Sequence, residues 1–392
     1  MKKKMKSMIA ILTAIAVVGT VNYFPKNENF RVENLISVSA NSSDGLFNYE
    51  IIDNEAIIVG VNDPNAYTLK IPDEMDGYPV TRIGENAFSD CKNLTSIEIS
   101  KSVKDIENEM FYWCYNLTKI IVDENNSNYC DVDGVLFDKE KTVLYKFPNS
   151  QLITSYSILD TVTRIGNGAF AGCSNLTNIK LPNSITSIGN SAFGGCDSLT
   201  SIEIPNSVIS IGDGAFSSCA SLETLEIPDS VTDIGSSAFN WCKNLNHIKL
   251  SEKITKIDEA TFFGCIGLKS IEIPDSVTSI GNVAFSMCTS LETIEIPNSV
   301  TSIGNATFRE CSSVAAIIIP NSVTSIGVSA FGSCNKLTSI EIPDSVTSIG
   351  ERAFGYNYDL KTENLKIYGY ENSEAQNYAE KNEMEFVPID NG

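Results

Sequence analysis

Cysteine is the residue whose spacing in this chain most directly suggests chemistry. Eight of the eleven cysteines, from Cys173 to Cys334, recur every 23 residues, and Cys91 and Cys114 keep the same interval. In an exported protein such a set could form disulfides or hold a metal ion. However, no two cysteines have a close metal-ligand spacing such as Cys-x-x-Cys, and each in-phase cysteine follows a phenylalanine in an apolar context. We therefore favour a buried row of reduced thiols, with the out-of-phase Cys130 as the most exposed thiol.

Histidine-based catalysis has a single candidate. His247 is the only histidine, and the sequence shows no evident partner for it. Serine, aspartate and glutamate recur at repeated positions, so none of them stands apart as an acid–base pair. We therefore expect a protein that is not an enzyme and that uses no cofactor and no metal ion.

The elements that must position these residues are copies of one unit, the stretch Val277–Ser299. Within it, Ile294-Glu295-Ile296 alternates apolar and charged residues as a half-buried strand does, and Pro297 ends that strand. A second, shorter strand ends at Ile280-Gly281, and the segment 282–288 is long enough for about two helical turns. A fixed period of this length indicates a solenoid. We predict a mainly β repeat solenoid of 23-residue units, each with a strand, a short second strand and a helical turn, around one continuous core with a cap at each end.

The N-terminus has the features of a secretory signal. Four lysines within residues 2–6 precede an apolar stretch at Met8–Val21, which is too short to favour a membrane span. Val38-Ser39-Ala40 offers small residues in a cleavage pattern, and an earlier cut near Gly19 is also open. We predict an exported chain that does not insert into a membrane after cleavage.

The rest of the chain divides at the places where the repeat fails. Two strand-like runs before residue 62 fall outside the repeat, Val135–Phe147 reads as a hairpin, and Ser373–Asn382 reads as a short amphipathic helix. We assign a signal peptide (1–40), an N-terminal cap (41–80), a solenoid (81–360) with a hairpin insertion near 122–158, and a C-terminal cap (361–392).

The composition is strongly acidic. The formal net charge is −21 and the sequence pI is about 4.5, so nucleic acid and anionic membranes are poor partners. A hydrophobic content of 42% is ordinary for a packed protein. We attribute this negative charge to the solubility of a secreted protein's surface.

The repeat also resembles a known family. Its consensus is Val-x-x-Ile-Gly-x-x-Ala-Phe-x-x-Cys-x-x-Leu-x-x-Ile-x-Ile-Pro-x-Ser, and with Asp76–Val80, Asp133–Phe137 and Ile367–Tyr370 it is similar to the BspA-like leucine-rich repeat family. The resemblance covers roughly residues 46–390. It implies a leucine-rich-repeat type of fold in a secreted or surface-exposed bacterial protein, and some relatives that act as adhesins.

The residue between the two apolar strand positions should line an exposed sheet. We name this set the outward row, and as candidate binding residues it contains Lys180, Glu203, Glu226, Lys249, Glu272, Glu295, Ile318 and Glu341. Charges that keep a sheet soluble explain this row better than a ligand does, although a ligand remains the alternative.

One unit departs from the acidic background of the others. It carries Trp241 together with the basic residues Lys243, His247, Lys249, Lys253 and Lys256. Drift of a redundant repeat explains this cluster about as well as a binding patch does. Trp241 and Trp113 each precede a cysteine and could be exposed anchors, because tryptophan is enriched at binding hot spots.

The sequence thus favours a non-enzymatic, adhesin-like binding scaffold, secreted or at the cell surface. We expect a monomer whose partner is a host or bacterial surface protein, or a glycan. The alternative is a structural protein of the cell envelope without a dedicated ligand.

Overall fold

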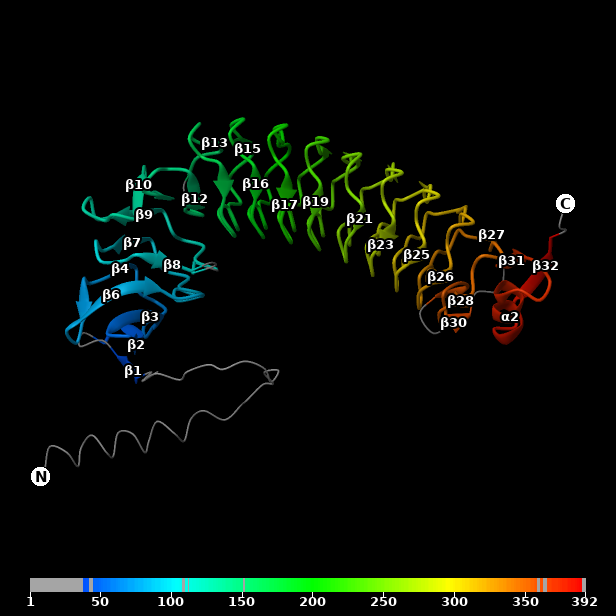
Figure 1. Cartoon of the computed structure of the whole chain (residues 1–392), viewed down its shortest axis with the longest axis horizontal. Coiled ribbons are helices and arrows are strands. Elements are labelled where there is room, and N and C mark those ends of the chain that lie inside the picture. The colour runs from blue at the N-terminus through cyan, green and yellow to red at the C-terminus, as the bar shows by residue number, and fades with distance from the viewer. Residues whose placement is uncertain are drawn as a thin grey trace, which may run out of the picture.

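The computed structural model describes residues 38–41, 45–107, 110–111, 113–150, 152–357, 360–361 and 365–389. Its coils stack into an arc that runs from an N-terminal sheet to helix α2 (Glu374–Lys381) (Figure 1). The predicted mainly β solenoid is confirmed.

The N-terminal end is a six-stranded sheet. Its order is β1-β2-β3-β6-β5, and β8 also pairs with β6. The strands are β1 (Val38–Asn41), β2 (Phe47–Ile52), β3 (Glu55–Val61), β5 (Glu74–Met75), β6 (Tyr78–Ile83) and β8 (Asp105–Ile106). Strand β1 pairs antiparallel with β2, so the expected cleavage motif at Val38–Ala40 lies within a paired strand.

Short strands that end at the Ile-Gly pair form two parallel ladders along the main solenoid. Each residue pairs with its copy one unit later, as Ile188 does with Ile211. The glycine that follows has no room for a side chain, because a Cβ at Gly304 would lie 2.7 Å from a backbone carbon of the previous coil. The strands are β14 (Arg164–Ile165), β16 (Ser187–Ile188), β17 (Ser210–Ile211) and β19 (Asp233–Ile234), then β21 (Lys256–Ile257), β23 (Ser279–Ile280), β25 (Ser302–Ile303), β26 (Ser325–Ile326) and β28 (Ser348–Ile349).

The longer strand of each unit, which a proline follows in most units (as Pro297 follows Ile296), forms shorter, interrupted parallel ladders. We call these the pre-proline strands. Figure 1 places β13, β15 and β27 toward the outer edge of the arc, and β16, β17 and β28 nearer its inner edge. These ladders are β4 (Thr68–Lys70) with β7 (Ser96–Ile99) and β9 (Lys119–Val122), β13 (Ser155–Ser157) with β15 (Asn178–Lys180), β18 (Thr224–Glu226) with β20 (His247–Lys249), β22 (Ser270–Ile271) with β24 (Thr293–Ile294), and β27 (Ser339–Glu341) with β31 (Lys366–Gly369) and β32 (Glu385–Pro388).

The segment between the short strand and the cysteine forms consecutive turns, so the expected helical turns are wrong. Ser191 (φ 51°) and Gly195 (φ 69°) are left-handed, and a right-handed helix cannot continue through such residues. The amide of Phe193 donates to the carbonyl of Ala215 in the next coil at 2.7 Å, while that of Cys196 donates back to Phe193 at 3.1 Å. Hydrogen bonds between coils therefore replace those of a helix.

The core contains a stack of phenylalanine rings. From Phe147 to Phe354 one ring per coil stacks on the next, with centroids 4.9 to 5.6 Å apart. Tyr378 of α2 then packs edge-on against Phe354 at 5.9 Å. A two-stranded hairpin of β29 (Tyr356–Asn357) and β30 (Leu360–Lys361) lies beside this end.

The expectation of one continuous core is wrong, because the hydrophobic core has two parts that meet at the hairpin insertion. The insertion consists of β10 (Tyr129–Val132), β11 (Val135–Asp138) and β12 (Val143–Lys146). In β11, Leu136 packs into the N-terminal core, whereas Val135 and Phe137 pack into the main core. Strand β12 then pairs parallel with β14, so the insertion starts the main ladder.

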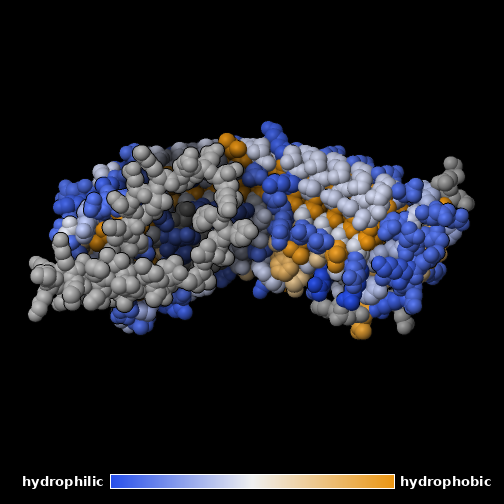
Figure 2. Space-filling view, turned by 60° about the horizontal axis from the view of Figure 1, so that its bottom comes forward, coloured by the Kyte–Doolittle hydropathy of each residue, from blue (hydrophilic) through white to orange (hydrophobic). Residues whose placement is uncertain are grey.

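None of the described helices is both long and apolar enough to cross a membrane. In the view tilted toward the inner side of the arc, residues of intermediate hydropathy and an apolar band cover the middle of the solenoid, and strongly hydrophilic residues gather toward the C-terminal end (Figure 2).

Candidate binding surfaces

The outward row is exposed along the pre-proline strands. All eight of its candidate residues are solvent-exposed, while the apolar residues on either side of each are buried. Ile318 is 75% exposed and bridges Glu295 on one side and Glu341 on the other. The structure therefore brings these side chains together as one row, as the alternation predicts.

Lys249 is neutralised within the outward row. It pairs in register with Glu226, and its Nζ lies 2.7 Å from the Glu226 carboxylate. This hydrogen bond, together with the charge of Glu226, raises the pKa of the lysine. His247 is exposed on the same strand, two residues earlier and on the same face. The unit thus presents a lysine–glutamate pair beside an imidazole.

Trp241 and Lys243 occupy the turn before that strand. Trp241 has a left-handed backbone (φ 57°), and its ring meets Phe263 edge-on at 5.3 Å. A Cβ at Gly264 would lie 2.7 Å from the indole, so this glycine makes room for the ring. The Nζ of Lys243 lies 5.7 Å from the ring centroid, in reach of a cation–π contact.

The remaining lysines of this unit lie elsewhere on the coil. Lys253 is exposed in the loop after β20. Lys256 lies on β21, where its Nζ is 2.8 Å from Asp258. The basic residues therefore encircle one coil, and only His247 and Lys249 share a strand.

The cysteine row is buried, and the structure contains eleven free thiols. Cys130 is the one thiol that is not buried, as expected from its place outside the repeat. Each in-phase thiol from Cys196 to Cys334 donates to the carbonyl of the phenylalanine one coil back, for example Cys265 to Phe239 at 3.1 Å. Burial raises the pKa of these thiols. Within the described ranges, no group of three or more metal-ligating side chains is placed to hold a metal ion.

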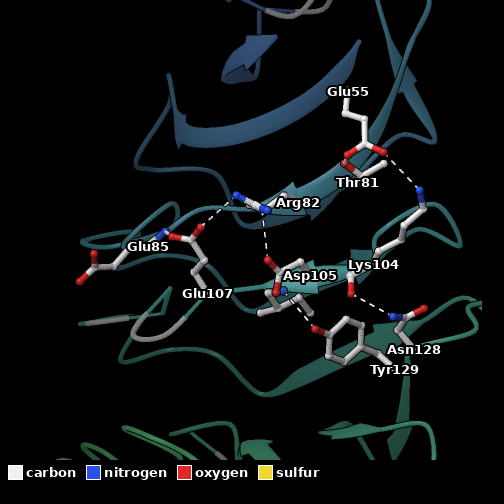
Figure 3. Close-up of polar contacts among 10 residues, drawn as sticks. Glu55, Thr81, Arg82, Glu85, Lys104, Asp105, Glu107, Asn128 and Tyr129 are labelled. Atoms are coloured by element: carbon white, nitrogen blue, oxygen red, sulfur yellow. Dashed lines mark hydrogen bonds and ion pairs between the residues drawn. The ribbon is translucent and has the colours of Figure 1, made fainter. Parts of the chain in front are cut away.

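Charged residues near the N-terminus are engaged with one another. Arg82 lies 3.1 Å from Asp105 and 3.8 Å from Glu107, and Lys104 lies 3.3 Å from Glu55 (Figure 3). The hydroxyl of Thr81 donates to Glu55 at 2.7 Å and is the main cause of that carboxyl's lowered pKa. These bonds join neighbouring strands of the N-terminal sheet, so this cluster serves to hold coils together.

A cavity of about 590 Å³, which the sequence did not predict, lies where the hairpin insertion meets the first coils of the main solenoid. We call it the break cavity. Three stretches line it, within 107–115, 143–149 and 164–218. Two features of the sequence indicate where this cavity lies. The 23-residue spacing of the cysteines fails between Cys114 and Cys173, and Trp113 directly precedes that interval.

Two buried polar side chains line the break cavity. Lys146 is 6% exposed, and its Nζ donates to the carbonyls of Gly168 at 3.2 Å and Ala171 at 3.3 Å. Burial lowers the pKa of this lysine. Asn149 is 5% exposed, and none of the described residues donates a hydrogen bond to its Oδ1. Such groups are rare in a well-packed interior.

Comparison with known proteins agrees with the geometry. The family model for the BspA type leucine rich repeat region matches six copies, over residues 65–132, 141–265 and 232–361. A leucine-rich repeat protein from Bacteroides ovatus is 28% identical, with a TM-score of 0.51 over 83% of this chain and 70% of that one. A leucine rich cell surface protein from Faecalibacterium prausnitzii is 26% identical, with a TM-score of 0.51 over 92% of this chain and 100% of that one. No curated protein matches the chain.

Proposed function

Because this chain belongs to the BspA-type leucine-rich repeat family, we propose that it is a secreted or cell-surface protein that binds a surface protein or a glycan and catalyses no reaction. The observation that carries the proposal is the outward row, an exposed set of side chains at fixed spacing on a stack of coils. Extended repeat surfaces of this kind bind partners through many shallow contacts.

Export of the chain is part of the proposal. Its support is the lysine-rich, apolar N-terminus and the similarity to a leucine rich cell surface protein from Faecalibacterium prausnitzii. The pairing of β1 with β2 favours the cut near Gly19, because cleavage after Ala40 would remove most of that strand. The N-terminal sequence of the exported protein distinguishes the two cuts.

The unit that contains Trp241 contributes Lys249 to the outward row and is the unit best suited to a specific contact. It combines an aromatic ring with Lys243 on it, and His247 and Lys249 on the next strand. Tryptophan is enriched at the centres of interfaces whereas lysine is depleted there, so Trp241 is the anchor of this unit and its lysines are the surrounding charges. A partner would meet the indole ring, the Lys243 cation and the His247 imidazole here, and mainly carboxylates along the rest of the row.

Binding to immobilised matrix proteins, bacterial surface proteins and glycans tests the proposal. We expect the purified, folded chain to bind one class saturably at physiological salt, and the double variant Lys249→Glu/Lys253→Glu to bind it at least about tenfold more weakly. Lys336→Glu is the matched control, since it reverses an exposed lysine in a distant coil. Folded protein that binds nothing on the panel would contradict the proposal and favour a structural role in the cell envelope.

A further inference from the structure

The break cavity has the size and enclosure of a small-molecule site. Ligand pockets in proteins typically enclose 300–1,000 Å³, and about 590 Å³ is enough for two or three sugar rings. It lies between coils from both sides of the insertion, whereas elsewhere successive coils stack directly. The cavity is thus a consequence of the one place where the repeat is interrupted.

Small residues keep the floor of the cavity open. The residue before the cysteine is Gly172, Gly195 or Ser218 in the three coils that line the cavity. In later coils the same position ranges from Gly264 and Ser333 to the larger Trp241, Met287 and Glu310. A Cβ at residue 172 would come within 3.0 Å of the Asn149 side chain. Larger residues at these positions would fill the space.

The two buried polar groups are complementary to a hydroxyl. A protonated lysine has three N–H donors, and two of those of Lys146 are taken by the carbonyls of Gly168 and Ala171. Among the described residues, no carbonyl accepts the remaining donor and no group donates to Asn149 Oδ1. A hydroxyl both accepts and donates, so a pair of sugar hydroxyls can satisfy both groups at once.

Three aromatic rings contribute to the lining of the cavity. Trp113 is 47% exposed, Tyr115 is 51% exposed, and Tyr145 is partly buried beside them. Rings of this kind offer apolar faces to the C–H face of a sugar and a polar edge to its hydroxyls. Arg164 and Lys146 are balanced by Glu107 and Asp197 in the lining, so the charges favour a neutral ligand over an acidic one.

We propose that the break cavity binds a neutral oligosaccharide, with Asn149 and Lys146 bonding its hydroxyls and Trp113 packing on a ring face. The inference rests on the proposed binding function, since it names one ligand class, but it uses a different surface from the outward row.

Fluorescence titration with neutral di- and trisaccharides (cellobiose, cellotriose, lactose, chitobiose and chitotriose) tests this site. The chain has two tryptophans, so a Trp241→Phe background leaves Trp113 as the reporter. We expect at least one saccharide to change its emission saturably. If none does, the inference fails, while panel binding of proteins through the outward row would remain possible.

Two variants and one control then place the ligand. We expect Trp113→Ala and Asn149→Leu each to weaken saccharide binding at least about tenfold by calorimetry. Met287→Ala is the matched control, because Met287 occupies the equivalent position in a coil away from the cavity, and it should bind as the wild type does. Trp113 is exposed, so its variant should fold even if Asn149→Leu does not. Equal affinity in folded Trp113→Ala protein would overturn the assignment.

Discussion

Reaction of the native protein with a thiol reagent gives a direct test of the packed core. Ten in-phase thiols are buried, and Cys130 is half-buried in the insertion. Burial raises the pKa of Cys173 and Cys242 from 9.0 to about 12. The thiolate is the reactive form, so a rise of this size lowers the thiolate fraction at pH 8 about a thousandfold. The buried thiols should therefore react only when coils open.

Mass spectrometry of protein treated with iodoacetamide at pH 8 counts the modified thiols. We expect one slow modification, at Cys130, in the folded protein and eleven after unfolding in guanidinium without a reductant. The variant Cys130→Ser should take up no label until it unfolds. Fast labelling of several in-phase thiols in the folded state would refute the burial argument. Thiols that stay unlabelled after unfolding would show that disulfides had formed.

Three further predictions concern stability. Phe285→Ala interrupts the ring stack between Phe262 and Phe308 and should lower the free energy of unfolding by about 3–5 kcal/mol, measured by denaturant titration, whereas Phe285→Leu should lose clearly less. Val283 is a β-branched residue with a left-handed φ of 49°, so Val283→Asn should raise the free energy of unfolding by about 0.5–1 kcal/mol. Ser237 occupies the equivalent left-handed position two coils earlier, and placing a β-branched residue there with Ser237→Val should lower the free energy of unfolding. Burial raises the pKa values of the thiols in the folded state, so as pH rises the thiols of the unfolded chain release their protons first. The midpoint of thermal unfolding should therefore move to lower temperature above about pH 9. An unchanged midpoint would contradict the raised pKa values.

The periodic part of the molecule was predictable from sequence. The repeat specifies which residues are buried, because each coil faces a copy of itself, and both the phenylalanine stack and the exposed outward row follow from that rule. The consecutive turns that replace the expected helical turns were not predictable in this way. Segment 282–288 has apolar spacing compatible with a helix, yet Val283 and Met287 are left-handed, and neighbouring coils take up the amides.

The break cavity lay beyond sequence reasoning for a different reason. Lys146 meets Gly168 and Ala171 only because β12 pairs with β14, and a single register shift would separate them. Lys146 itself looks like any surface lysine of a charged hairpin. Contacts made once in a chain leave no periodic trace, so the sequence indicated where the repeat fails but not what forms there.

The most direct test of the account is the binding of a variant that loses both proposed contact regions. This variant combines Lys243→Thr, His247→Ser, Lys249→Glu and Lys253→Ser in the unit of Trp241 with Trp113→Ala at the break cavity. We predict that it unfolds cooperatively as the wild type does and binds the ligand that the wild type selects at least about tenfold more weakly, because these residues supply the specific contacts. Wild-type affinity in this variant would contradict the account and assign binding to other parts of the solenoid.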